Sequence, residues 1–135
     1  MYRVKDVVTG FLQNSGKILI LLRSDKVGSY QGRWAGVSGY VEKENSPEEQ
    51  IYIEILEETN LTKDDIEIIK RGKPIEVVDT DMKVAWIIHP FLFKVDEPEK
   101  IKIDWEHIDY RWIEPDELKG YETVPYLNDT LLEVL

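Results

Sequence analysis

The sequence predicts an α+β fold in a single domain that spans residues 1–135. A chain of 135 residues can bury one ordinary hydrophobic core and is too short for two. Short apolar runs rich in β-branched residues recur along it and are separated by Gly, Asn and Pro, which is typical of strands joined by turns. Helical signals are confined to two or three segments, and many strands with few helices indicate a mixed α and β domain.

The beginning of the chain predicts a β-hairpin. Residues 4–12 and 17–22 are apolar runs joined by an Asn-Ser-Gly turn signal. The second run is continuously apolar after its first lysine, so its strand is expected to be buried on both faces. Further strands are expected at residues 34–41, 66–69, 75–78, 82–95, 101–103 and 110–113.

The clearest helix is expected over residues 47–59. Ser46 and Glu49 form an S-x-x-E capping box, and Pro47 suits the first helical position. Asn60 follows, where a helix often needs a left-handed residue. The packing side of the helix is expected to carry Ile51, Tyr52, Ile55 and Leu56. Shorter helices are expected to begin at residue 114 and to close the chain over residues 126–134.

The composition restricts the functions open to the chain. Its 27 acidic residues outnumber 17 basic ones, and a net charge of −10 repels nucleic acid, so no nucleic-acid partner is expected. Cysteine is absent, which excludes disulfides, thiolate metal sites and thiol catalysis. No apolar run is long enough to span a membrane and no signal-peptide pattern opens the chain, so we expect a cytoplasmic protein without a membrane partner.

A row of carboxylates lies on the predicted helix. Glu54, Glu57 and Glu58 are spaced so that they share one helix face. Like charges at this spacing destabilise a helix by about 0.2–0.5 kcal/mol per pair in water. A solvated acidic face is the common explanation of such a row, but a bound cation would turn the repulsion into a binding site.

The surroundings of this row resemble a known motif. Residues 39–61, which begin GYVEKEN and end EETNL, are similar to the Nudix box, G-x5-E-x7-R-E-U-x-E-E-x-G-U, where U is aliphatic. The matching positions are Gly39, Glu54, Ile55, Glu57, Glu58 and Leu61, and Asn60 stands in place of the second Gly. The order of elements on both sides also resembles the family. The resemblance implies an α/β/α sandwich with a mixed β-sheet.

Two further departures from the box concern the support of Glu54. Asn45 stands in place of the first Glu and Ile53 in place of the Arg. In the family these two residues are understood to support one another and to hold the following Glu. Because both are replaced, no unpaired ion is left. Glu42 and Glu44 are nearby acids that are candidates for part of this role.

The resemblance implies a metal-dependent hydrolase. Its substrate would be a small molecule, a nucleoside diphosphate linked to another group, whose pyrophosphate bond is cleaved by water. Carboxylate-bound Mg²⁺ or Mn²⁺ would neutralise phosphate oxygens and activate that water. The expected metal ligands are Glu54, Glu57 and Glu58, with the main-chain carbonyl of Ser38. Glu54 is also a catalytic candidate.

A second catalytic acid is expected downstream. In the family, an acid precedes by six residues a Trp that begins the last strand region. Glu106 and Trp112 have this separation, so Glu106 is the candidate. Asp104 and Asp109 are its rivals.

Basic and aromatic residues near the box are candidates for substrate contacts. They are Arg23, Arg33, Trp34 and Tyr40, the arginines for phosphate and the rings for stacking on a base. Trp86 and His89 lie in the long apolar strand and are expected to be structural. His107 lies beside the candidate acid and has a better claim to a functional contact. The sequence leaves a monomer and a homodimer both open.

Two alternative hypotheses remain. The chain could be a catalytically weak or inactive nucleotide-binding module, because the replaced Glu–Arg pair could leave Glu54 poorly aimed. It could also be an acidic interaction domain without a ligand, but that leaves the glycine spacing of the box unexplained. The three retained glutamates favour the hydrolase.

Overall fold

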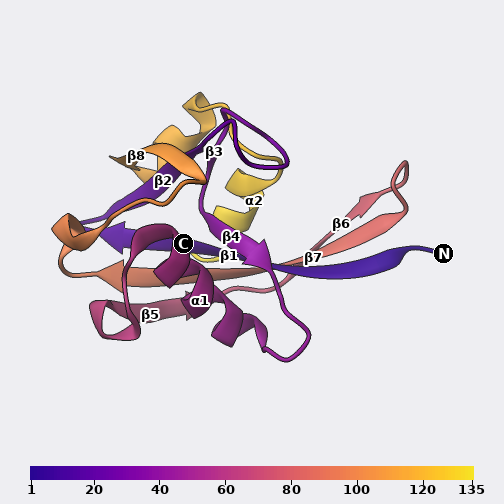
Figure 1. Ribbon diagram of the computed structural model, residues 1–135, viewed down its shortest axis with the longest axis horizontal. Helices are drawn as coiled ribbons and strands as arrows, with labels where there is room; N and C mark the ends of the chain where they lie inside the picture. Colours follow the sequence, from indigo (N-terminus) through magenta and orange to yellow (C-terminus); the bar gives the residue numbers. More distant parts are fainter.

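A mixed β-sheet forms the centre of the computed structural model, which describes residues 1–135 (Figure 1). Its strands are β1 (Arg3–Asn14), β2 (Lys17–Arg23), β3 (Trp34–Ala35), β4 (Val37–Tyr40), β5 (Ile66–Arg71), β6 (Ile75–Asp79), β7 (Val84–Val95) and β8 (His107–Ile113). The helices are α1 (Pro47–Thr59) and α2 (Leu127–Leu132), with the 3-10 segments η1 (Lys63–Asp65), η2 (Pro98–Lys100) and η3 (Pro115–Gly120).

Strand β1 organises the sheet, because it pairs with β2, β4 and β7. Its pairing with β7 is parallel and runs from Arg3 opposite Val84 to Gln13 opposite Lys94. All other strand pairs are antiparallel. One parallel pair among antiparallel ones makes the sheet mixed, as expected.

The predicted hairpin is confirmed as β1 and β2, joined by a turn in which Ser15 and Gly16 both have positive φ. The apolar run of β2 is buried on both faces. Leu19 and Leu21 belong to one hydrophobic core, and Ile18 and Ile20 belong to a second one. Continuous apolarity therefore marks a strand between two layers.

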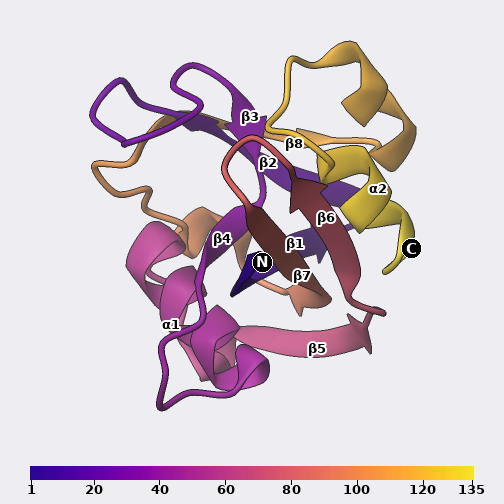
Figure 2. The same ribbon diagram turned by 90° about the vertical axis from the view of Figure 1, so that its right-hand side faces the viewer.

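Helices cover the two faces of the sheet (Figure 2). On one face, Ile51 and Ile55 of α1 pack in the core that includes Phe93. On the other face, Leu118 of η3 and Leu131 of α2 pack in the second core. The predicted α/β/α arrangement with a mixed sheet is confirmed. No helix is long and apolar enough to cross a membrane.

Helix α1 has the bounds that its caps predict. The Ser46 hydroxyl accepts the Glu49 N–H at 3.1 Å, and the Glu49 carboxylate accepts the Ser46 N–H at 2.8 Å. Asn60 ends the helix in the left-handed conformation, with φ of 66°. The predicted packing side is partly wrong, because Leu56 is 47% exposed, whereas the polar Gln50 is 2% exposed.

Two other expectations need correction. Residues 101–103 form no strand. The Lys102 N–H donates to the carbonyl of Thr59, so this segment is tied to the end of α1 and Ile101 fills the adjoining core. The segment after residue 114 is the 3-10 helix η3 and not an α-helix.

Part of the sheet extends beyond the helices as an arm, to the right in Figure 1. We define the arm as residues 3–6 of β1, 84–88 of β7 and all of β6. In it β6 pairs with β7, and β7 pairs with β1. The face of β6 that carries Ile75, Val77 and Asp79 is half-buried, while Glu76 and Val78 are exposed.

Candidate functional site

The site begins where α1 lies against β4. Gly39 in β4 touches the carboxylate of Glu54 so closely that a Cβ atom at Gly39 would overlap it. A side chain at this position would therefore displace Glu54. A glycine at this strand position therefore allows the backbone to approach the first glutamate of the row closely.

A chain of uncharged hydrogen bonds holds Glu54. The side-chain amide of Gln50, one helical turn earlier, donates to Glu54 Oε2 at 2.8 Å. The carbonyl oxygen of the same amide accepts from Asn45 Nδ2 at 2.9 Å and from the Glu42 N–H at 3.0 Å. Gln50 is almost completely buried, so both ends of its amide are satisfied inside the protein.

This amide chain includes Asn45, which stands at the box position of the missing Glu. Of the two nearby acids proposed to substitute, Glu42 contributes only its backbone N–H, and the side chain of Glu44 is exposed and makes no hydrogen bond. Ile53 is also exposed, at 39%, and does not reach Glu54. Gln50, which the sequence analysis did not select, is the residue that holds Glu54.

Glu58 has a different environment. Its side chain is 2% exposed, and its Oε2 atom has no hydrogen-bond partner. Its Oε1 atom lies 3.7 Å from Nε2 of the buried His107, whose Nδ1 lies 3.0 Å from Asp104 Oδ1. A buried carboxylate oxygen without a partner is rare in native proteins and indicates a missing ligand.

The acids of the site raise one another's pKa. Burial and then the charges of Glu106, Glu54 and Asp104 raise the pKa of Glu58 well above its ordinary value. Burial also raises the pKa of Glu54 and Glu106, and neighbouring negative charges raise it further. The positive charge of Arg23 lowers the pKa of Glu106. Burial lowers the pKa of His107, which keeps its ring uncharged near neutral pH.

The predicted downstream acid lies at this cluster. The charge of Glu106 acts on both Glu54 and Glu58. Its rival Asp104 binds His107 and accepts the Glu106 N–H at 3.3 Å, so it acts as a support. Asp109 is exposed, accepts the neighbouring N–H of Tyr110 and is not among the charges that act on the glutamates.

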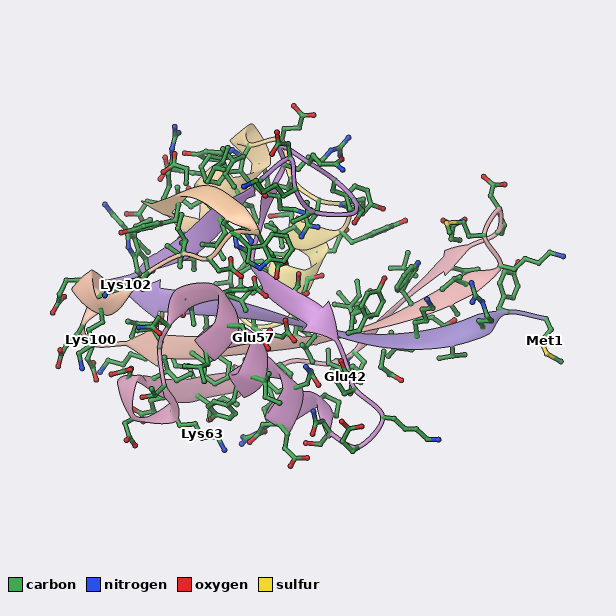
Figure 3. The ribbon with its side chains drawn as sticks, viewed as in Figure 1. Met1, Glu42, Glu57, Lys63, Lys100 and Lys102 are labelled. Atoms are coloured by element: carbon green, nitrogen blue, oxygen red, sulfur yellow. The ribbon has the colours of Figure 1, made fainter.

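The donor set fits a hard divalent cation. It consists of carboxylate oxygens, one of them buried and unpartnered, in a place where acids repel one another. Glu57, labelled on α1 in Figure 3, is exposed and free to turn. No three His, Asp or Glu side chains form a ready-made cage, so binding a cation requires these side chains to converge.

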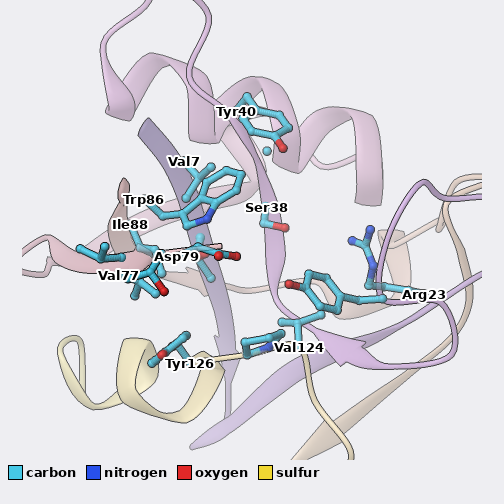
Figure 4. Close-up of a pocket in the computed structure, with 16 residues that line it drawn as sticks. Val7, Arg23, Ser38, Tyr40, Val77, Asp79, Trp86, Ile88, Val124 and Tyr126 are labelled. Atoms are coloured by element: carbon cyan, nitrogen blue, oxygen red, sulfur yellow. The ribbon is translucent and has the colours of Figure 1, made fainter. Parts of the chain in front are cut away.

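A cavity of about 540 Å³ (Figure 4) has Gly39 in its wall, the residue that touches Glu54. It lies between the arm, β4 and the segment before α2. Two of the predicted substrate contacts, Arg23 and Tyr40, line it, and so does Ser38, which was expected to be a metal ligand. This volume is within the range of small-molecule sites, about 300–1,000 Å³.

Arg33 and Trp34 do not line the cavity. Arg33 donates to the carbonyl of Thr123 at 3.2 Å. Trp34 is 9% exposed and packs edge-on against Tyr121 at 5.5 Å between ring centroids. The local reason is that β3 pairs with β2 and presents the Trp34 ring to the second core.

Trp86 was expected to be structural but lines the cavity. Its ring lies 5.9 Å from that of Tyr40, between centroids, with the planes tilted by 38°. It escapes the core because β7 continues into the arm beyond the cover of α1. His89 is paired with Asp6 at 2.8 Å, in line with a structural role.

The chain is similar to known proteins both in sequence and in structure. The NUDIX domain model matches residues 1–132. The nucleoside triphosphatase NudI of Escherichia coli O139:H28 is 30% identical over 131 residues, which cover 89% of each chain. The MutT protein of Methanosarcina mazei superposes with a TM-score of 0.74 at 25% identity, covering 97% of this chain and 92% of that one. The Caenorhabditis elegans Ap4A hydrolase has the same TM-score at 17% identity, with 97% and 93% covered.

Proposed function

Since the chain belongs to the NUDIX domain family, we propose that it is a hydrolase of nucleoside triphosphates or closely related nucleoside diphosphate derivatives, acting on a pyrophosphate bond. The name of the NudI relative, a nucleoside triphosphatase, supports the triphosphate class. A triphosphate is itself a nucleoside diphosphate linked to a further phosphate, so this is the simplest member of the expected substrate class.

One observation carries the proposal. Gly39 lines the cavity and also touches the Glu54 carboxylate, so the acids lie directly beside the space for a ligand. A nucleoside in the cavity would direct its phosphates past Gly39 toward α1. Arg23 lines the same cavity and is close enough to Glu106 to lower its pKa, which places a positive charge at the junction.

Glu54, Glu57 and Glu58, with the Ser38 carbonyl, are the proposed ligands of Mg²⁺ or Mn²⁺. A divalent cation held there supplies positive charge to the phosphate oxygens and makes water a better nucleophile. The unpartnered Oε2 of Glu58 would gain its missing partner. The chain itself sets the position of one proposed ligand, because the amide chain through Gln50 fixes Glu54 before any cation binds.

The reaction requires one proton acceptor. The oxygen of water forms a bond to phosphorus, the bridging P–O bond breaks, and the leaving phosphate or diphosphate keeps the bridging oxygen. The proton of the water passes to a carboxylate, for which Glu54 and Glu106 are the candidates. Burial raises the pKa of Glu106, which brings it closer to neutrality, where a general base works best.

An assay of product release tests the proposal. The protein is incubated with Mg²⁺ and a panel of nucleoside triphosphates, nucleoside diphosphate sugars and dinucleoside polyphosphates, and released phosphate and nucleotide are measured. We expect turnover of triphosphates that stops when the cation is chelated. Turnover of none of these compounds with either Mg²⁺ or Mn²⁺ would contradict the proposal.

The role of Glu106 has its own test. Glu106→Gln is expected to lower kcat by at least about a hundredfold, in line with loss of a general base. Asp109→Asn is the matched control, because Asp109 is exposed and its charge does not act on Glu58. This variant should retain wild-type turnover. A Glu106→Gln variant with wild-type kcat would leave proton acceptance to Glu54.

The inactive binding module is the weaker candidate. This hypothesis rested on the expectation that loss of the Glu–Arg pair leaves Glu54 poorly aimed. Glu54 is instead held by a buried amide that is itself held from two sides. The structure contains no other feature that favours a module without turnover.

A further inference from the structure

The cavity has one charged side chain of each sign. Among its lining residues Arg23 is the only basic one and Asp79 the only acidic one. Figure 4 shows them on opposite sides of the cavity. Arg23 lies opposite His107 in the β2–β8 pair, next to Glu106, so its side is the one that adjoins the proposed cation site. Asp79 therefore marks the end away from the phosphates.

Asp79 is held in place without using both of its oxygens. It ends β6 on the half-buried face of the arm. Its Oδ1 accepts the N–H of Met82 at 3.0 Å, which closes the turn before β7. Its Oδ2 takes part in no hydrogen bond within the protein. An oriented carboxylate with one free oxygen can accept a hydrogen bond from a ligand.

The neighbouring surface suits a flat ring. Val77 lies opposite Trp86 in the β6–β7 pair, and Asp79 is one step along the same face. The rings of Trp86 and Tyr40 are 5.9 Å apart, which is too close for a base to insert between them, since each contact needs about 3.5 Å. A base would instead lie against one ring face, with its polar edge toward Asp79.

We propose that Asp79 selects nucleotides whose base carries an amino group, a specificity that rests on the proposed function. A carboxylate only accepts hydrogen bonds, so it pairs with the amino group of cytosine, adenine or guanine. Uracil and thymine present a carbonyl oxygen at the position where cytosine has its amino group, and two acceptors repel one another. Phosphate is excluded from this end for the same reason.

Two substrate pairs isolate the amino group. Cytosine and uracil nucleotides differ at the 4-position, and guanine and hypoxanthine nucleotides differ by the 2-amino group. We expect the wild-type protein to favour dCTP over dUTP, and dGTP over dITP, by about tenfold in kcat/KM. A lack of preference in both pairs would overturn the proposal.

The Asp79→Asn variant tests the residue itself. Its side-chain oxygen can still accept the Met82 N–H, so the turn should be retained, while its amide can donate to the uracil carbonyl. The preference for dCTP over dUTP should disappear or reverse, with total turnover of the better substrate changed less. Asp81→Asn is the matched control, because Asp81 is an exposed acid of the same turn outside the cavity, and it should retain the wild-type ratio.

Binding without cation separates this proposal from the proposed function. Calorimetric titration with dCMP and dUMP in the presence of a chelator measures base preference alone. If no triphosphate is hydrolysed but dCMP binds about tenfold more tightly than dUMP, the hydrolase proposal fails and the role of Asp79 stands. Equal binding, or a preference unchanged in Asp79→Asn, overturns the role of Asp79 whatever the turnover.

Discussion

Glu54 and Glu58 lie one turn apart on α1, and the protein holds them in opposite ways. Glu54 is half-buried and receives a hydrogen bond from Gln50, which belongs to an uncharged amide chain. Glu58 is buried with one oxygen unpartnered, beside a histidine that burial keeps uncharged. One carboxylate receives a hydrogen bond in the free protein, and the other has an oxygen without a partner.

The difference separates two tasks within one row of acids. Glu54 is positioned by the protein, so its geometry does not depend on a cation. Burial disfavours the charged form of Glu58, so Glu58 gains most from a bound cation. Of the two proposed ligands, Glu54 would be prearranged, and cation binding would offset the desolvation of Glu58.

The largest effect is expected from removing the charge of Glu58. Glu58→Gln should lower kcat/KM by about a thousandfold and weaken Mg²⁺ binding, because an amide is a poor ligand for a hard cation. Mg²⁺ at about a hundred times its dissociation constant should stabilise the wild-type protein by about 2.7 kcal/mol and the variant by much less. Thermal unfolding with and without Mg²⁺ measures this, and an unchanged Mg²⁺ titration would remove Glu58 from the ligand set.

The next effect concerns the support of Glu54. Gln50→Ala should lower kcat by about 10–100-fold, as is usual when a residue that orients a ligand is lost, with KM little changed. Ile53→Ala is the control on the same helix, since the Ile53 side chain is exposed and can make no hydrogen bond to Glu54, and it should retain wild-type kcat. Equal kcat values for the two variants would show that the amide chain does not matter for turnover.

The comparison also predicts a pH dependence of stability. The pKa of Glu58 is raised in the folded state, so between its ordinary value of 4.5 and the folded value the folded protein binds more protons than the unfolded chain. Stability then falls as pH rises through that window. In a chelator, the urea midpoint of wild-type protein should fall more between about pH 5 and pH 8 than that of Glu58→Gln. Parallel curves for the two proteins would contradict this.

The smallest effect is expected at Asn45. Asn45→Ala removes one of the two donors to Gln50 and leaves the Glu42 N–H in place. Loss of one such hydrogen bond is worth about 0.5–1.5 kcal/mol, so kcat should fall by about 2–10-fold. Steady-state kinetics of Asn45→Ala and Gln50→Ala shows which variant loses more kcat. A larger loss of kcat in Asn45→Ala would show that Glu54 is not held mainly through Gln50.

Local signals in the sequence predicted the elements well. The capping box and Asn60 gave the bounds of α1, and the continuous apolar run gave a strand buried on both faces. The strand predicted at residues 101–103 is absent. Alternation alone does not distinguish a strand from an extended segment that is hydrogen-bonded to a helix end.

The sequence pointed to Glu54, Glu58 and Glu106, whose charges act on one another in the structure, but not to every residue around them. Gln50 was missed although its spacing of four from Glu54 is the signal of a helical side-chain pair. Trp86 lines the cavity and Trp34 packs in the second core, the reverse of what was expected, because which face of a strand meets solvent depends on strand pairing and on where a covering helix ends. Neither is contained in the local sequence.

The parallel pairing of β1 with β7 has a consequence for biosynthesis. Arg3 lies beside Val84, so the first strand finds this neighbour only after 81 further residues have been made. At about 5–20 residues per second, that delay is about 4–16 s. During it the hairpin of β1 and β2 offers an unpaired, strongly apolar edge to other nascent chains. The yield of folded protein should therefore depend on translation speed and on chaperones that shield this edge.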